Sequence, residues 1–184
     1  MPKTIIVPER EFYDEKSGRF ITTKRTVLQL EHSLRSIRDW EAKHHKPYLS
    51  KETKTDAETL DYFRCMCINR SDVDPMVFRA LSNRQRKEIF DYMNDPMTAV
   101  TLHRPNNGPS RGIVTAIRVY FWMSNYGIPF DPCEKWHFNM LMALIDEAVD
   151  KNNPKKKSGR LTAAQARERA ALNDQRRAAR HSRG

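Results

Sequence analysis

The stretch from Leu30 to Leu49, LEHSLRSIRDWEAKHHKPYL, constrains this chain more than any other. Its apolar residues recur at intervals of three and four, which is the spacing of one stripe on an amphipathic helix. With one residue from before the stretch, the stripe consists of Val27, Leu30, Leu34, Ile37 and Trp40. Pro47 disfavours helical backbone in the residue before it, so we expect the helix to end near His45 or Lys46.

Residues 4–28 have the composition of β structure. TIIV is a short β-branched run, and the segments EFYDE and RFITT flank a tight-turn signal at Lys16, Ser17 and Gly18. The sequence therefore predicts a β-hairpin, which makes residues 1–28 an N-terminal arm. Because an isolated hairpin is only marginally stable in water, the arm must lie against the helices of its own chain or against a neighbouring subunit.

Three short helices are predicted after the first one from their start signals. Thr55 and Glu58 have the spacing of a capping box, in which each residue's side chain accepts from the other's backbone amide, and residues 82–85 (SNRQ) repeat it. Asp74 before Pro75 supplies an N-cap followed by proline at the first helical position. These signals place helix starts near residues 55, 74 and 82.

Two more helices are predicted after a loop at residues 103–112, which contains two prolines and two glycines. The buried stripe predicted for the first is Ile113, Ile117, Tyr120, Phe121 and Ser124. Gly127 and Pro129 should end it, and the Asp131-Pro132 pair should begin the second. The connection is so short that we expect the two helices to pack as an antiparallel pair.

At 184 residues the chain is long enough for one domain with a substantial core. The predicted fold is mainly α: a single helical domain at residues 29–150, a small N-terminal β-hairpin at residues 1–28, and a basic, partly helical C-terminal tail at residues 151–184. The predicted core residues are Leu30, Leu34, Ile37, Trp40, Phe121, Trp136, Met140 and Leu144.

The positive charge is concentrated at the C-terminus. Residues 150–184 contain 11 Lys and Arg against 3 Asp and Glu, which leaves only +2 of the total net charge of +10 for the rest. Such a run can neutralise phosphates, bind an acidic protein or simply be a solvated face. The candidate partner-binding residues in it are Lys155, Lys156, Lys157, Arg176, Arg177 and Arg180.

The residues that could support catalysis or metal binding do not form recognisable motifs. Cys65 and Cys67 are one residue apart, which is too close for a paired zinc motif, and on a helix their thiols would point to nearly opposite faces. No Ser, Cys or Thr lies in a glycine-rich elbow, and the 6 glycines form no phosphate-binding loop. We therefore expect no enzymatic activity, no metal and no cofactor, and structural roles for the histidines.

The cellular location follows from cysteine content and hydropathy. Three cysteines without a signal peptide favour a reducing compartment, so the cytoplasm is expected. No apolar run approaches the ~20 residues that span a bilayer, so no membrane role is expected.

Three stretches of the chain resemble siphophage proteins known as tail assembly chaperones: LEHSLRSIRDWEAKHHKPYL, VYFWMSNYGIPFDPCEKWHFNMLMALI and LNDQRRAARHSRG. The resemblance depends chiefly on Leu30, Glu31, His32, Ser33, Leu34, Trp40, Glu41, Ile128, Pro129, Trp136, His137, Leu172, Asn173 and Arg176. It implies a small non-enzymatic protein that coats the long hydrophobic helix of the tape-measure protein while tail-tube subunits polymerise around it.

The resemblance also implies a location and partners. The protein would act in the host cytoplasm, bind the tape-measure protein and possibly the tail-tube protein, and be absent from the mature virion. Two other functions stay open from the residues alone: a small basic nucleic-acid-binding phage protein, and a minor structural protein of the tail or virion. Residues 150–184 contain no aromatic side chain for base stacking, which weighs against single-strand recognition.

Overall fold

The structure is a computed structural model of the chain, and it describes residues 2–15, 18–99 and 113–152. The chain divides into two compact units, Met1–Ala148 and Val149–Gly184. All of the elements below belong to the first unit, except the last turn of the final helix. The predicted boundary between body and tail, after residue 150, lies two residues from this division.

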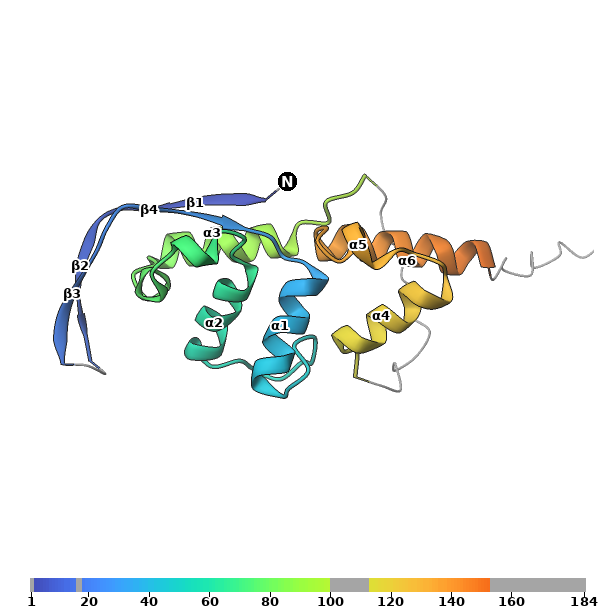
Figure 1. Ribbon diagram of the computed structural model, residues 1–184, viewed down its shortest axis with the longest axis horizontal. Coiled ribbons are helices and arrows are strands. Elements are labelled where there is room, and N and C mark those ends of the chain that lie inside the picture. The colour runs from blue at the N-terminus through green and yellow to red at the C-terminus, as the bar shows by residue number, and fades with distance from the viewer. Residues whose placement is uncertain (1, 16–17, 100–112, 153–184) are drawn as a thin grey trace, which may run out of the picture. The chain divides into compact units, whose positions relative to one another are not determined.

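The N-terminal residues form two antiparallel strand pairs along one ribbon (Figure 1). The strands are β1 (Lys3–Val7), β2 (Arg10–Asp14), β3 (Arg19–Thr23) and β4 (Thr26–Leu30). β1 pairs with β4, and β2 pairs with β3. In the first pair Ile5 and Leu28 lie opposite each other and are buried, whereas the adjacent pair of Ile6 and Val27 is exposed. This alternation is the two-residue period of a sheet with one face on the core.

Six α-helices follow in the described residues: α1 (Leu34–His44), α2 (Asp56–Met66), α3 (Asn83–Asn94), α4 (Ala116–Asn125), α5 (Phe130–Cys133) and α6 (Phe138–Asn152). Two 3₁₀ turns, Arg70–Asp72 and Pro75–Phe78, lie between α2 and α3. The capping boxes predicted at Thr55 and Ser82 are confirmed, with both reciprocal hydrogen bonds present in each. Asp74 does act as an N-cap, but of a 3₁₀ turn.

The prediction of a mainly α fold with one small hairpin is wrong, because the described chain is mixed α/β with two small antiparallel sheets. The error begins at residues 26–30 (TVLQL), which were assigned in part to a helical stripe. Burial alternates along these residues, with Leu28 and Leu30 inward, and β1 pairs with them along the strand. The helix therefore begins only at Leu34, after Ser33 accepts a hydrogen bond from the Ser36 amide as its N-cap.

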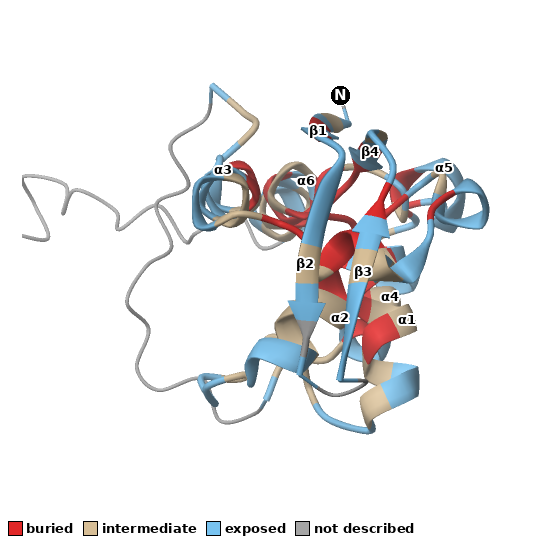
Figure 2. Ribbon diagram, turned by 90° about the vertical axis from the view of Figure 1, so that its left-hand side faces the viewer, coloured by how far each residue is buried: buried red, intermediate tan, exposed pale blue. Residues whose placement is uncertain are grey.

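The core lies where α1 packs against α2 and α4, with β1 on α3. Figure 2 shows buried segments on α1 and α2, while β2 and β3 are largely exposed or half-buried. Four of the predicted core residues are confirmed as buried: Leu30, Leu34, Ile37 and Trp40. Trp40 also donates its indole N–H to the Glu58 carbonyl at 3.0 Å, which ties α1 to the first turn of α2.

The other predicted core residues need correction. Phe121 is 60% exposed and Leu144 is 38% exposed, while Trp136 and Met140 are half-buried. On α4, the residues turned inward are Ala116, Val119 and Met123. On α6 they are Phe138, Leu141, Met142, Ala143 and Ile145.

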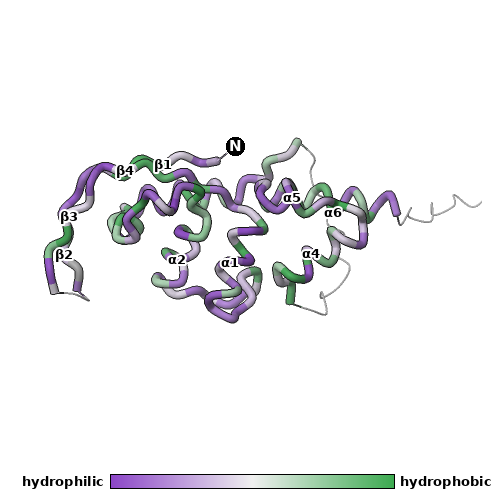
Figure 3. Tube along the Cα trace, viewed as in Figure 1, coloured by the Kyte–Doolittle hydropathy of each residue, from purple (hydrophilic) through white to green (hydrophobic). Residues whose placement is uncertain are grey.

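The positions of α4 and α6 explain these errors. α4 packs mainly against α1, and the short α5 separates α4 from α6, so the predicted antiparallel pair does not form the core. α6 begins at Phe138, where the Phe138 amide donates to the His32 carbonyl at 2.6 Å. Its inward face is therefore set by this anchor and differs from the stripe that starts at Trp136. Figure 3 shows hydrophobic residues along α4. Two of them, Ile117 and Phe121, are exposed.

Candidate partner-binding groove

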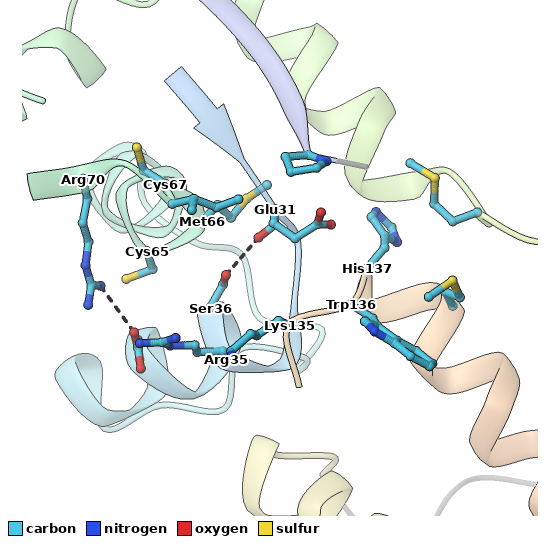
Figure 4. A pocket seen from close by; sticks show the side chains of 15 residues that line it. Glu31, Arg35, Ser36, Cys65, Met66, Cys67, Arg70, Lys135, Trp136 and His137 are labelled. Carbon is cyan, nitrogen blue, oxygen red and sulfur yellow. Dashed lines mark hydrogen bonds and ion pairs between the residues drawn. The ribbon is translucent and has the colours of Figure 1, made fainter. Parts of the chain in front are cut away.

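A groove of about 500 Å³ opens between α1, the end of α2 and the residues that precede α6 (Figure 4). α1 contributes Arg35, Ser36 and Asp39, and the end of α2 contributes residues 65–67. The segment before α6 contributes residues 135–137. The Arg35 amide donates to the Glu134 carbonyl at 3.0 Å, which holds the first turn of α1 beside that segment.

The apolar wall of the groove is rich in methionine. Met66, Met97 and Met140 line it together with Ile68 and Trp136. Methionine is unbranched and polarizable, so it adapts to partners of different shape, and it is common at protein surfaces that bind amphipathic helices. Trp136 adds a broad, half-buried ring to the same wall.

The charged rim carries three cations, of which two are paired. Arg70 lies 3.3 Å from Asp39, and Asp39 is also bound by Arg38 at 2.9 Å. Lys135 forms an ion pair with Asp131. The side chain of Arg35 is exposed and forms no ion pair with any residue in the described part of the chain.

Buried polar side chains lie behind this wall. The Tyr92 hydroxyl donates to the Glu31 carboxylate at 2.6 Å, and His32 Nδ1 lies 2.5 Å from the Tyr62 hydroxyl oxygen. His137 Nε2 donates to the Tyr92 carbonyl at 3.2 Å, because Nδ1 of the same ring accepts from the Asn139 amide at 3.3 Å. These contacts connect the ends of β4 and α3 to the start of α6.

Burial shifts the pKa values of this cluster. Desolvation, with a smaller contribution from His137, lowers the pKa of His32 from 6.5 to about 3, so the ring is neutral at pH 7. Desolvation likewise lowers the pKa of His137 and raises the pKa of Glu31 above its ordinary value. His32 and His137 both lie in short connections just before helix starts. A buried pair of this kind, neutral and hydrogen-bonded to its neighbours, supports the fold of the junction.

Several of the residues behind the family resemblance occupy this junction and its surroundings. Glu41 is an example, since its two carboxylate oxygens accept from the Tyr48 amide at 2.9 Å and the Ala116 amide at 2.8 Å. It therefore ties the loop after α1 and the start of α4 to one helix. Ile128 is buried, whereas Leu172, Asn173 and Arg176 lie outside the described residues.

The cysteine thiols are protonated at neutral pH. Burial raises the pKa of Cys65 to about 11 and also raises that of Cys67, which is buried and contacts the Asn69 carboxamide.

Within the described ranges, no group of three or more His, Cys, Asp or Glu side chains is arranged to hold a metal ion. The helices described there include none long and apolar enough to cross a membrane.

The six basic residues predicted to bind a partner, Lys155, Lys156, Lys157, Arg176, Arg177 and Arg180, all lie outside the described residues. Sequence reasoning had not identified the groove. Trp136 and Met140 were assigned to the core because their apolar spacing is the same in a core stripe and in a groove wall. Arg35 was assigned only to an outward helix face.

A second candidate surface is the outer face of α4. Ile117 and Phe121 are 73% and 60% exposed, and Ile113, just before the helix, is 61% exposed. The spacing of four residues places Ile117 and Phe121 on one line along the helix, whereas Ile113 lies before its start. Both surfaces have the chemistry of protein binding.

No family model matches the chain, and comparison with curated proteins and with solved structures finds no significant match.

Proposed function

We propose that this chain is a tail assembly chaperone of the siphophage class, which holds the tape-measure protein during assembly of the tail tube. The observation that supports the proposal best is the exposed pair of Ile117 and Phe121 on one face of α4, with Ile113 exposed just before the helix. A helix face that is apolar, regularly spaced and uncovered suits the binding of another apolar helix through anchors at i and i+4. In the resemblance, the partner's binding segment is a long hydrophobic helix.

The composition of this face supports an apolar partner in particular. The α4 helix has a single charged residue, Arg118, which lies over the Trp122 ring with its guanidinium carbon 5.9 Å from the ring centroid. No carboxylate or ammonium group lies on the Ile117 and Phe121 line. The attraction would therefore come from burial of apolar area, with little dependence on salt.

The remaining parts of the proposal follow from the resemblance. The protein acts in the host cytoplasm without enzymatic activity, with the tail-tube protein as a further possible partner, and it leaves before the virion is complete. The basic tail at residues 151–184 would add an electrostatic grip on the complex. It is also the feature that favours the second candidate function, nucleic-acid binding, because clustered Lys and Arg release counterions from phosphates.

Co-expression with the tape-measure protein of the same phage tests the proposal. We expect the intact chain to keep the tape-measure protein soluble and to be recovered with it. Ile117→Asp and Phe121→Asp should each abolish recovery, because a charge would be buried in an apolar contact. Asn83→Asp is the control: it adds the same charge at an exposed position of α3, outside this face.

Two results would contradict the proposal. One is failure of the intact chain to recover the tape-measure protein at any salt concentration. The other is equal recovery by the α4 variants and the control. Tight DNA binding that falls steeply with salt and is lost with residues 151–184, or with Arg176→Glu and Arg177→Glu, would instead establish the nucleic-acid function.

A further inference from the structure

The groove beside α1 is separate from the α4 face, and its chemistry differs from it. The α4 face is an apolar line, whereas the groove combines an apolar wall with a cationic rim. A volume of about 500 Å³ accommodates several side chains of a partner segment. We therefore expect the groove to bind a segment that is apolar on one side and charged at its edge.

The apolar wall of the groove indicates which apolar side chains a bound segment would present. Met66 is 1% exposed and forms the base, while Met140 and Trp136 are half-buried and flank it. Flexible methionines beside an aromatic ring suit leucine-sized or methionine-sized side chains that project from a helix at i, i+3 or i+4, and i+7. A flat or purely polar ligand would leave this wall in water.

The cationic rim of the groove indicates the sign of the charge on the bound segment. On the rim, Arg35 is exposed and forms no ion pair with a described residue, and its backbone amide is hydrogen-bonded to Glu134, next to Lys135. Asp39 on the same rim is shared by two arginines, so its charge is already compensated. Figure 4 shows Arg35, Lys135 and Trp136 along the groove edge. A carboxylate on the bound segment would form an ion pair with Arg35 at this edge.

We propose that the groove binds an amphipathic helical segment of a partner protein, with its apolar side chains on Met66, Trp136 and Met140 and an acidic side chain on Arg35. Charge complementarity selects this occupant: a basic segment, including the chain's own residues 151–184, would meet like charge at the rim. The inference does not depend on the tape-measure protein, because it concerns a different surface.

A synthetic peptide measures this binding directly. The probe is a fluorescent helical peptide of about 14 residues with Leu at i, i+3 or i+4, and i+7, flanked by Glu on one side. A second peptide has Lys at each Glu position. Fluorescence anisotropy with the full chain should show the Glu peptide binding about tenfold more tightly than the Lys peptide, with the difference shrinking as salt is added.

Variants assign the binding to the groove. Met140→Glu should abolish binding of the Glu peptide, while Leu144→Glu, one turn further along the exposed side of α6, should leave it unchanged. Arg35→Glu should reverse the preference so that the Lys peptide binds better. Arg84→Glu is its charge-matched control at an exposed position of α3.

The outcomes separate this inference from the proposed function. Equal binding of the two peptides, or an unchanged preference in Arg35→Glu, would overturn the groove assignment even if the tape-measure protein is recovered. Conversely, loss of tape-measure recovery in Ile117→Asp with unchanged peptide binding would confirm that the two surfaces are distinct. Circular dichroism of each variant checks that its fold is native. Trp136 indole shifts in NMR spectra of the unmodified chain report occupancy of the groove without relying on the variants.

Discussion

The imidazole rings of His32 and His137 lie with their centroids 5.4 Å apart, and both side chains are buried. One precedes α1 and the other precedes α6, so this contact joins two helix starts that are about a hundred residues apart in the sequence. Neutral rings are compatible with that burial, whereas two imidazolium ions side by side are not.

Stability should therefore fall with acidification. The pKa of His32 is lowered to about 3, so below pH 6.5 the unfolded chain binds a proton that the folded chain does not. The contribution of His32 to the free energy of unfolding is fully present above pH 6.5. It should fall by up to about 1.4 kcal/mol per pH unit between pH 6.5 and 3. Glu31 opposes the loss only at the acid end, because its raised pKa lets the folded state take up a proton first.

Thermal melting between pH 7.5 and 5 checks this dependence. His32→Phe should flatten it, although its melting temperature at pH 7.5 should be lower because the Tyr62 hydroxyl loses its partner. His45→Asn should keep the wild-type slope, since His45 is exposed and asparagine tolerates its left-handed backbone (φ 52°). A wild-type slope in His32→Phe would contradict the assignment.

Glu41→Ala should destabilise the protein by about 2–4 kcal/mol, because it leaves the amides of Tyr48 and Ala116 without their acceptor. Urea denaturation at pH 7 gives the change in the free energy of unfolding. Glu52→Ala, at an exposed position in the following loop, should change it by less than about 0.5 kcal/mol. Equal effects of the two variants would show that the bridge at Glu41 is unimportant.

The two tryptophans Trp40 and Trp136 should differ in their contributions to stability. Trp40→Ala removes a ring that is 1% exposed and stacked on His44, so it should cost about 3–5 kcal/mol. Trp136→Ala removes a half-buried ring in the groove wall and should cost at most about 2 kcal/mol. Denaturation curves for both variants give the comparison, which would be wrong if Trp136→Ala proved the more damaging.

A matched pair on α4 tests which face is buried. Met123→Ala should cost about 2–5 kcal/mol, since its side chain is fully buried. Phe121→Ala should change the free energy of unfolding by no more than about 0.5 kcal/mol, because most of its ring is already in water. The reverse order would mean that the helix is rotated from its position in the structure.

Local signals in the sequence determined where α2 and α3 begin. The capping boxes at Thr55 and Ser82 form as predicted, because the donor and acceptor atoms lie within three residues of each other and need no distant partner. Gly127 ends α4 with a φ of 66°, which its lack of a side chain allows. Burial of Leu34, Ile37 and Trp40 also followed from their spacing on α1.

The tertiary structure decided which faces are buried and which are left as surfaces. Leu30 is buried as the last residue of a strand because β1 pairs with it, and no helical period reveals that partner. α4 offers apolar residues on two faces, and packing against α1 selected Val119 and Met123 over Phe121. The groove, likewise, is lined by segments far apart in the sequence, two of which are joined by the hydrogen bond from the Arg35 amide to the Glu134 carbonyl. Spacing records which residues share a face, but only the position of the neighbouring elements determines whether that face meets protein or water.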